Sequence, residues 1–306
     1  KPVFETARPA APKRTESRGQ HTLIRWWFRR WMLVGLAPLL SLTMPSTAAA
    51  QFDFGVITPA YADHENRHNP SIAFGENGCL PSSAVNAHGD LNQGMGDDRS
   101  VSRGCRGDGS PNLANAYVRS CCARISGRDM CAYVYGFYFV KDFISNLWPG
   151  GHVHDWEHVI VYATDGKVTH GGASAHGTVK MKAWSEILAK SEDQSSFKVV
   201  YHKDGLLTHA MRFATVRDLK TAEFHSMTLL SWRRMSPTVQ DALGNKTHFG
   251  KASLKLRNDR FWRLINNSEI RPEGYPSLTV AEGHPYSTDT CTLAPGKRGD
   301  RLPQED

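Results

Sequence analysis

Apolar and aromatic residues gather in short runs between residues 131 and 232. The segments "CAYVYGFYFVK" (131–141) and "EHVIVYAT" (157–164) are dense in aromatic and β-branched residues, which favour strands. Three further runs have the same character: "FKVVYH" (197–202), "HAMRFAT" (209–215) and "FHSMTLLSW" (224–232). The pattern therefore predicts a chain that is mainly β.

Helical patterns are fewer. We expect one helix in "VKMKAWSEILAKS" (179–191) and another in "DRFWRLINN" (259–267), with Asp259 as its N-cap. Many strands with a few interposed helices are typical of a mainly β (α+β) fold, a β-sandwich flanked by helices. The fold class alone indicates no function.

Neither a repeat nor a low-complexity linker divides residues 51–291, and the sequence therefore predicts a single domain there. Within it, residues 75–108 are rich in Gly, Asn and Asp, which favour turns and loops. The segment 292–306 is polar and contains Pro and Gly, and we expect a flexible tail.

Residues 1–50 resemble an export leader behind a disordered extension. "RWWFRR" forms a positive region, "WMLVGLAPLLSLTM" an apolar region, and Ala48 and Ala50 a small-residue cleavage site before Gln51. The apolar run is too short, and interrupted by Pro38, to span a bilayer. We expect a secreted protein, and a retained amphipathic anchor is the alternative.

The net charge of +7 belongs to the leader. Its 50 residues hold eight of the 37 Lys and Arg and two of the 30 Asp and Glu, which leaves 29 basic and 28 acidic residues in the remainder. Nucleic-acid binding would need a basic face in the folded part. The sequence gives no sign of one, and we expect no nucleic-acid partner.

Six cysteines follow the leader, and an even number in a secreted protein favours disulfides. A cysteine zinc site is the competing interpretation, but the chain has no C-x-x-C pair. Asn245 and Asn266 each begin a glycosylation sequon. The cysteines are Cys79, Cys105, Cys121, Cys122, Cys131 and Cys291.

The octet "GHVHDWEH" (151–158) holds the densest chemistry of the chain. It follows the aromatic strand after a turn, so the two segments predict a β-hairpin with a long loop. In such a hairpin Asp142 lies beside Asp155, and Asp155 and Glu157 share one face of the second strand. His152, which we expect in the loop, folds over the same spot.

Three carboxylates at one hairpin end repel one another, and a divalent cation resolves that conflict. Oxygen ligands with one imidazole suit Mg²⁺, Ca²⁺ or Mn²⁺. His154 and His158 alternate to the opposite face, where packing is the preferred role. A three-histidine zinc site, with Glu157 as a general base, is the alternative.

Five segments carry a resemblance to a known family. "GHVHDWEHV" resembles the heptapeptide G-H-R-H-D-W-E of the necrosis- and ethylene-inducing (Nep1-like, NPP1) proteins. Four more segments resemble other blocks of that family, in the same order, between about residues 77 and 268: "NGCLPSSAVNAHGDLNQGM", "YVYGFYFVKD", "THAMRFAT" and "FGKASLKLRNDRFWRLI".

The resemblance implies a secreted cytolysin, not an enzyme, whose β-sandwich is similar to actinoporins and fungal lectins. Such proteins bind a divalent cation (Mg²⁺ or Ca²⁺) and sphingolipid headgroups of the plant plasma membrane, glycosylinositol phosphorylceramides. The family's ligands carry over onto Asp142, His152, Asp155 and Glu157. The resemblance also implies a disulfide between Cys79 and Cys105 and leaves the other four cysteines unassigned. The expected headgroup-lining residues are Trp148, His154 and His209.

The chain also departs from the family pattern. Val153 replaces the heptapeptide's Arg, Val140 replaces a Pro, and no aromatic residue stands directly ahead of His209. The loop between Asp142 and His152 is about two residues longer than is common in the family. One alternative is therefore a non-toxic, sugar-binding member detected by plant immune receptors, since "AYVYGFYFVKD" is similar to the family's immunogenic segment. The other is a metal-dependent hydrolase, whose only candidate triad would use His209.

Overall fold

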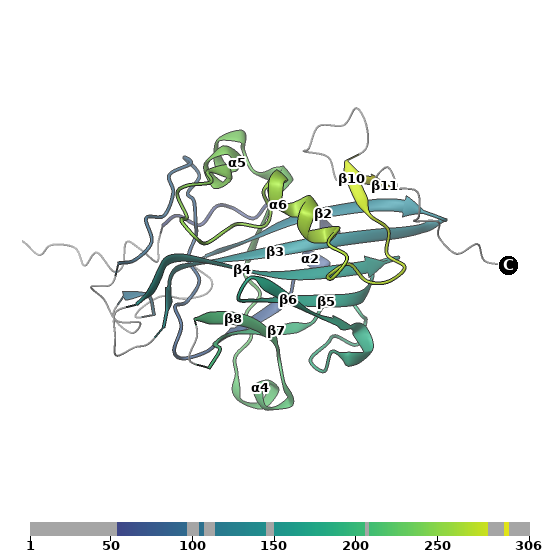
Figure 1. Cartoon of the computed structure of the whole chain (residues 1–306), viewed down its shortest axis with the longest axis horizontal. Helices are drawn as coiled ribbons and strands as arrows, with labels where there is room; N and C mark the ends of the chain where they lie inside the picture. The colour runs from purple at the N-terminus through teal and green to yellow at the C-terminus, as the bar shows by residue number, and fades with distance from the viewer. Residues whose placement is uncertain are drawn as a thin grey trace, which may run out of the picture. The chain divides into compact units, whose positions relative to one another are not determined.

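The computed structural model describes residues 54–96, 104–106, 114–144, 150–205, 208–280 and 291–293 (Figure 1). The expected leader, Trp148 and the part of the expected tail beyond residue 293 lie outside these ranges. Among the described residues, no helix is long and apolar enough to cross a membrane.

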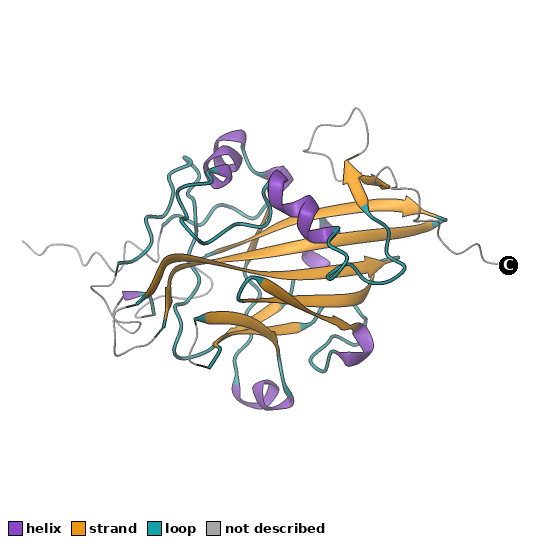
Figure 2. Cartoon of the chain, in the orientation of Figure 1, coloured by secondary structure: helices purple, strands orange, loops and turns teal. Residues whose placement is uncertain are grey.

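A six-stranded sheet forms the larger layer, in the order β6-β5-β4-β3-β2-β9. Strands β2 to β6 pair antiparallel with their neighbours in the chain, and β9 joins β2 in parallel. Figure 2 shows the long central strands of this sheet. The bounds are Asn115–Ile125 (β2), Arg128–Phe143 (β3), Gly151–Thr164 (β4), Lys167–Ala175 (β5), Thr178–Ala183 (β6) and Thr228–Ser231 (β9).

A three-stranded sheet, β1-β7-β8, packs against the larger one through β4 and β5. The Phe139 ring of β3 stacks on the Tyr201 ring of β7 at 3.8 Å between centroids. Gly171 lets the layers approach, because a Cβ there would lie 2.6 Å from the Phe197 ring. The predicted β-sandwich is confirmed. The bounds are Ser71–Phe74 (β1), Lys198–Lys203 (β7) and His209–Phe213 (β8).

Short helices lie outside the sheets (Figure 2). Helix α5 begins behind Ser236, whose hydroxyl accepts a hydrogen bond from the Val239 amide, and has Pro at its first turn. Helix α4 begins with a capping box between Thr215 and Asp218. The bounds are Asp63–Arg67 (α2), Val216–Thr221 (α4), Pro237–Gly244 (α5) and Asn258–Ile265 (α6), with 3₁₀ turns Trp184–Glu186 (η2) and Trp232–Arg234 (η3).

The predicted helix 179–191 is wrong. Thr178–Ala183 is the edge strand β6, and only the single turn η2 follows it. Pairing with β5 overrides the helical pattern, because Gly172 leaves room for the side chains of Val179 and Met181, which a Cβ there would overlap.

The helix predicted at 259–267 is present as α6, but it begins one residue earlier and its N-cap is Arg257. Asp259 therefore lies inside the first turn, where its carboxylate accepts hydrogen bonds from the Arg257 guanidinium at 2.8 and 3.1 Å. The prediction of Asp259 as the N-cap is wrong.

The apolar runs did not predict strands β1, β2, β5, β6, β10 (Leu278–Val280) and β11 (Cys291–Leu293), and β2 and β5 show why. In β2 the polar Arg119 lies buried, where its guanidinium donates to the Leu256 carbonyl oxygen at 2.7 Å and stands 4.7 Å from the Phe261 ring centre. In β5 the small pair Gly171 and Gly172 breaks the expected bulky pattern. Both strands are defined by their partners rather than by their own composition.

All six cysteines pair. Cys79–Cys105 closes the Gly- and Asn-rich loop, as the family resemblance implied. Cys122–Cys131 joins directly opposed residues of β2 and β3. Cys121–Cys291 ties β2 to β11 (Cys291–Leu293), which pairs with β10 (Leu278–Val280).

The length of the chain between two linked cysteines predicts how much each disulfide stabilises the fold. Cys121 and Cys291 are 170 residues apart, whereas Cys122 and Cys131 are nine apart. Replacing the first pair by alanines is expected to lower the free energy of unfolding by about 2–3 kcal/mol more than replacing the second, because the longer closed loop restricts the unfolded chain more. Urea denaturation of the two double variants measures this, and equal losses would contradict the loop-length argument.

Candidate metal centre

The hairpin of β3 and β4 carries the acidic residues of the octet. Asp142, near the end of β3, pairs directly with His152 near the start of β4, and Phe139 pairs with Asp155. The expectation that His152 lies in the loop is wrong, because strand pairing continues to Phe143 and Gly151.

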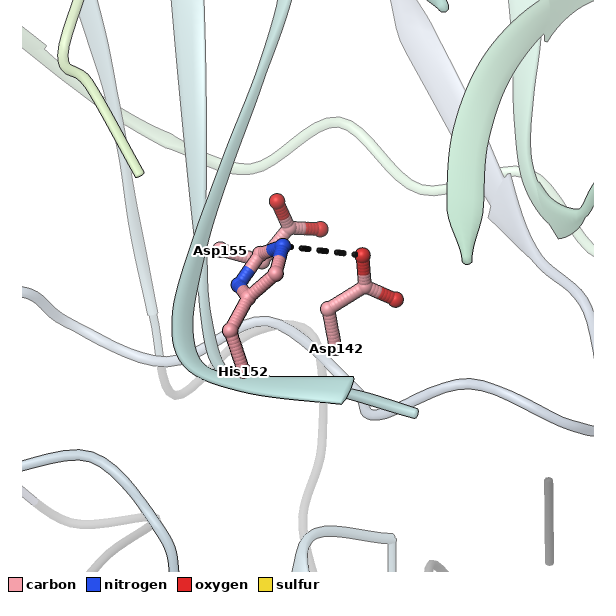
Figure 3. A group of neighbouring side chains, drawn as sticks. All are labelled: Asp142, His152 and Asp155. Carbon is pink, nitrogen blue, oxygen red and sulfur yellow. Dashed lines mark ion pairs between the residues drawn. The ribbon is translucent and has the colours of Figure 1, made fainter. Parts of the chain in front are cut away.

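An irregular backbone conformation in β4 allows the Asp142–His152 pair and Asp155 to lie close together. Directly opposed residues share a face, so strict alternation would place Asp142 and His152 opposite to Asp155. His154 interrupts the alternation with a φ of +64°, which is uncommon for a side-chain-bearing residue. One ligand atom of each of Asp142, His152 and Asp155 then lies within 4.8 Å of the others. Figure 3 shows these three side chains turned toward one another.

The Nε2 atom of His152 faces the Asp142 carboxylate. Its Nδ1 lies 2.7 Å from the His154 carbonyl oxygen, which can only accept, so Nδ1 donates its proton there. In a neutral imidazole, Nε2 is then an acceptor, and it lies 3.5 Å from Asp142 Oδ2, another acceptor. Two facing acceptors require a shared positive charge, supplied by a second ring proton or by a cation.

The smaller sheet fixes the other oxygen of Asp142. Oδ1 accepts from both the backbone amide and the Nδ1 of His209, each at 2.9 Å. The His209 side chain is 1% exposed, and its Nε2 has no hydrogen-bond partner within the part of the chain that is described. His209, which the sequence analysis expected to line the headgroup site, is therefore buried and holds the Asp142 carboxylate by two hydrogen bonds.

Tyr201 and Ser174 hold the remaining carboxylates, and sequence analysis missed both. The Tyr201 hydroxyl donates to Asp155 Oδ2 at 3.0 Å. The Ser174 hydroxyl donates to Glu157 Oε2. Glu157 shares the strand with Asp155 but is not one of the three residues whose ligand atoms converge. Neither partner has a motif, because each reaches the site from a different strand.

The carboxylates are buried with little positive charge around them. Burial, followed by repulsion from Asp142, raises the pKa of Asp155 well above its usual range, and the Tyr201 hydrogen bond only partly opposes this. Burial and the charges of Asp155 and Asp142 likewise raise the pKa of Glu157, against the opposing effects of Ser174 and Lys255. A bound cation would offset the free-energy cost of burying these ionised carboxylates together.

The other two octet histidines pack among aromatic side chains or in the sheet. His154 Nδ1 lies 2.6 Å from the Tyr138 hydroxyl, and burial lowers the His154 pKa to about 4. Burial lowers the His158 pKa to about 3, and neither of its ring nitrogens has a hydrogen-bond partner among the residues described. The converging group contains one histidine and two aspartates, so the three-histidine arrangement is not assembled there.

The donor set fits a hard divalent cation. Carboxylate oxygens with one imidazole match the ligands of Mg²⁺, Ca²⁺ or Mn²⁺, and no thiolate is near because every cysteine is in a disulfide. His152 is 35% exposed at its side chain, whereas Asp142 is 2% exposed, so the site opens to solvent on the imidazole side.

The two sequons differ in their surroundings. Asn245 is exposed, and its Oδ1 accepts from the Thr247 amide and hydroxyl. Asn266 is partly buried, and its amide exchanges two 2.8 Å hydrogen bonds with the Leu278 backbone. A glycan at Asn266 would break these bonds, so Asn245 is the better candidate. Glycosylation at either residue stays a prediction.

Comparison with known proteins identifies the family. Residues 62–268, more than half of the chain, match the sequence model described as necrosis inducing protein (NPP1). The chain belongs to this family. The necrosis-inducing protein NPP1 of Phytophthora nicotianae is 28% identical over 203 residues, which cover 63% of this chain and 76% of that protein. NLP effector protein 10 of Phytophthora capsici is 31% identical over 199 residues, covering 63% and 77%.

Solved structures of the NPP1 family share the fold. Necrosis and ethylene inducing protein 2 from the causal agent of cocoa's witches' broom disease superimposes with a TM-score of 0.57 at 25% identity, over 68% of this chain and 92% of that one. The non-toxic HaNLP3 protein gives 0.55 at 25% identity over 68% and 94%. NLPPya in complex with glucosamine gives 0.53 at 26% identity over 69% and 93%.

The raised pKa of Asp155 predicts how the destabilisation caused by burying its carboxylate depends on pH. A carboxyl whose pKa is higher in the folded than in the unfolded protein contributes its full stability to the fold below about pH 4, where it is protonated in both states. That contribution is lost as the pH rises through the folded-state pKa. Asp155→Asn mimics the protonated form at every pH. With a chelator present, its free energy of unfolding relative to the unmodified protein is therefore expected to increase by about 1 kcal/mol or more between pH 4 and 7.

Urea denaturation across that pH range measures the difference. His154 and His158, whose lowered pKa values act in the opposite direction, are present in both proteins and largely cancel. A difference that does not change with pH would contradict the burial of an uncompensated Asp155 carboxylate.

Proposed function

We propose that this protein is a secreted, cation-dependent cytolysin that binds the sugar headgroups of plant glycosylinositol phosphorylceramides and disrupts plasma membranes, triggering cell death and immunity. The observation that carries the proposal is the convergence of two buried aspartates, Asp142 and Asp155, with His152, so that one ligand atom of each lies within 4.8 Å of the others. Family membership supports the necrosis-inducing role.

Asp142, His152 and Asp155 would hold the cation, with Glu157 as a fourth ligand that Ser174 keeps nearby. The cation is Mg²⁺ or Ca²⁺, and when bound it supplies positive charge and exchangeable coordination positions for hydroxyl oxygens. The partly exposed His152 edge is where a sugar would enter. Crystal structures of NLPPya in complex with glucosamine and with mannosamine support a sugar as the ligand.

This proposal assigns no chemical reaction to the site. A hydrolase would need a nucleophile activated by a base. The base that the sequence suggested, His209, uses its Nδ1 on Asp142, and its buried Nε2 contacts no hydroxyl within the described residues. The hydroxyls of Tyr201 and Ser174 donate to the carboxylates of Asp155 and Glu157. These side chains support binding rather than catalysis.

A second candidate is a non-toxic member that binds the sugar, or is detected by plant immune receptors, without damaging membranes. Val153 favours it, because this residue is 39% exposed beside the site where the family heptapeptide has Arg. Losing that charge weakens attraction to an anionic headgroup. The similarity to the non-toxic HaNLP3 protein is also comparable to that of other relatives.

The proposal predicts leakage that depends on the cation and on Asp155. Dye release from plant plasma-membrane vesicles is expected with the unmodified protein, to be lost on adding a chelator, and to return with excess Mg²⁺ or Ca²⁺. Asp155→Ala is expected to abolish release, because it removes a buried ligand. Asp241→Ala, which removes an exposed carboxylate on α5, is the matched control and keeps full release.

Each outcome discriminates. No leakage from a folded, cation-loaded protein would overturn the cytolysin and favour the non-toxic member. Leakage that survives chelation would remove the cation from the mechanism. An Asp155→Ala chain that is unfolded by circular dichroism would show that the residue is structural.

A further inference from the structure

The proposed ligands all belong to the larger sheet, on β3 and β4. The smaller sheet nevertheless reaches the site through Tyr201 of β7 and His209 of β8. We infer that Tyr201 is a positioning residue, which orients the Asp155 carboxylate for the cation and couples cation binding to the packing of the two sheets. This inference rests on the proposed function, because it assumes that the cation binds Asp155.

The Tyr201 ring is clamped on several sides. It stacks on Phe139 with 3.8 Å between centroids and an interplanar angle of 8°, and it lies 4.9 Å from the His209 ring at 23°. Gly78 packs against the edge of the ring, since a Cβ there would lie 2.8 Å from Tyr201 Cε1. A ring held in this way has no freedom to carry its hydroxyl elsewhere, so the place of the donor is fixed.

The donor matters because a carboxylate rotates easily. The final torsion of an aspartate has a broad energy profile, so burial alone does not fix the direction of its two oxygens. The Tyr201 hydroxyl has a single proton, and it donates that proton to Asp155 Oδ2 at 3.0 Å. The hydrogen bond thereby sets the plane of the carboxylate in which a ligand oxygen faces His152 and Asp142.

The same bond links the two layers, beside the hydrogen bonds from His209 of β8 to Asp142 of β3. Tyr201 is fully buried, and its partner Asp155 is 5% exposed, so the bond is shielded from competing water. A cation that orders Asp155 would therefore also order β7, although β7 contributes no proposed ligand. The consequence can be measured on amides that the cation does not touch.

Tyr201→Phe removes the hydroxyl and keeps the stacked ring. We expect Mn²⁺ affinity, measured by isothermal titration calorimetry and by the decrease of free Mn²⁺ in electron paramagnetic resonance, to fall by about 10- to 100-fold, the usual effect of losing a partner behind a metal ligand. Tyr162→Phe is the matched control. It also deletes one buried hydroxyl, which donates to the Ile265 carbonyl oxygen at 2.9 Å. Tyr162 lies seven residues from Asp155 along β4, so this hydroxyl is not part of the proposed cation site.

We expect the two variants to lose comparable stability in the absence of the cation. Only Tyr201→Phe is expected to lose Mn²⁺ affinity. Unchanged Mn²⁺ affinity in a folded Tyr201→Phe variant would overturn the positioning role and leave the proposed function intact. Failure of the unmodified protein to bind Mn²⁺ at all would instead overturn the proposed cation site, so the two failures are distinguishable.

A second measurement needs no variant. In the unmodified protein, saturating Mn²⁺ is expected to slow hydrogen exchange of the β7 amides, residues 198–203, as well as those of β3 and β4. Exchange in β7 that is the same with and without the cation would overturn the coupling between sheets, even if Tyr201→Phe did not fold.

Discussion

The structure depends on one electrostatic constraint, which is that the carboxylates of Asp142, Asp155 and Glu157 are buried close enough to repel one another. His152 Nε2 and Asp142 Oδ2 lie 3.5 Å apart, with Asp155 within the same small volume. Burial denies the carboxylates the water that would otherwise screen them. A positive charge, from a second proton on the His152 ring or from a bound cation, offsets this repulsion, and the proposed function takes a cation as its source.

The fold creates the constraint by two means. The antiparallel register of β3 and β4 sets Asp142 against His152, and the left-handed conformation of His154 interrupts the alternation between His152 and Asp155 in β4. The partners behind the carboxylates come from other strands, so the geometry exists only when both sheets are packed. A site of this kind is rigid on its protein side and open on the side of His152.

Sequence reasoning predicted the aromatic strands, the sandwich and the convergence of Asp142 with Asp155, because aromatic runs and the octet are local signals. The helix expected at 179–191 failed, since pairing with the glycine-bearing strand β5 decided that segment. Tyr201 and Ser174 were not found, because a lone hydroxyl has no pattern until the fold brings it to a carboxylate. His152 was placed in a loop because the extent of pairing beyond Asp142 is set by the tertiary fold.

The most direct test of the central claim is the position of a cation in a crystal. Anomalous scattering from crystals of the protein grown with Mn²⁺ would locate the ion without assumptions about its ligands. We expect one strong peak among Asp142, His152 and Asp155, close to Glu157. A peak elsewhere, or none at this place with Mn²⁺ in excess, would contradict the assignment of these residues as a cation site.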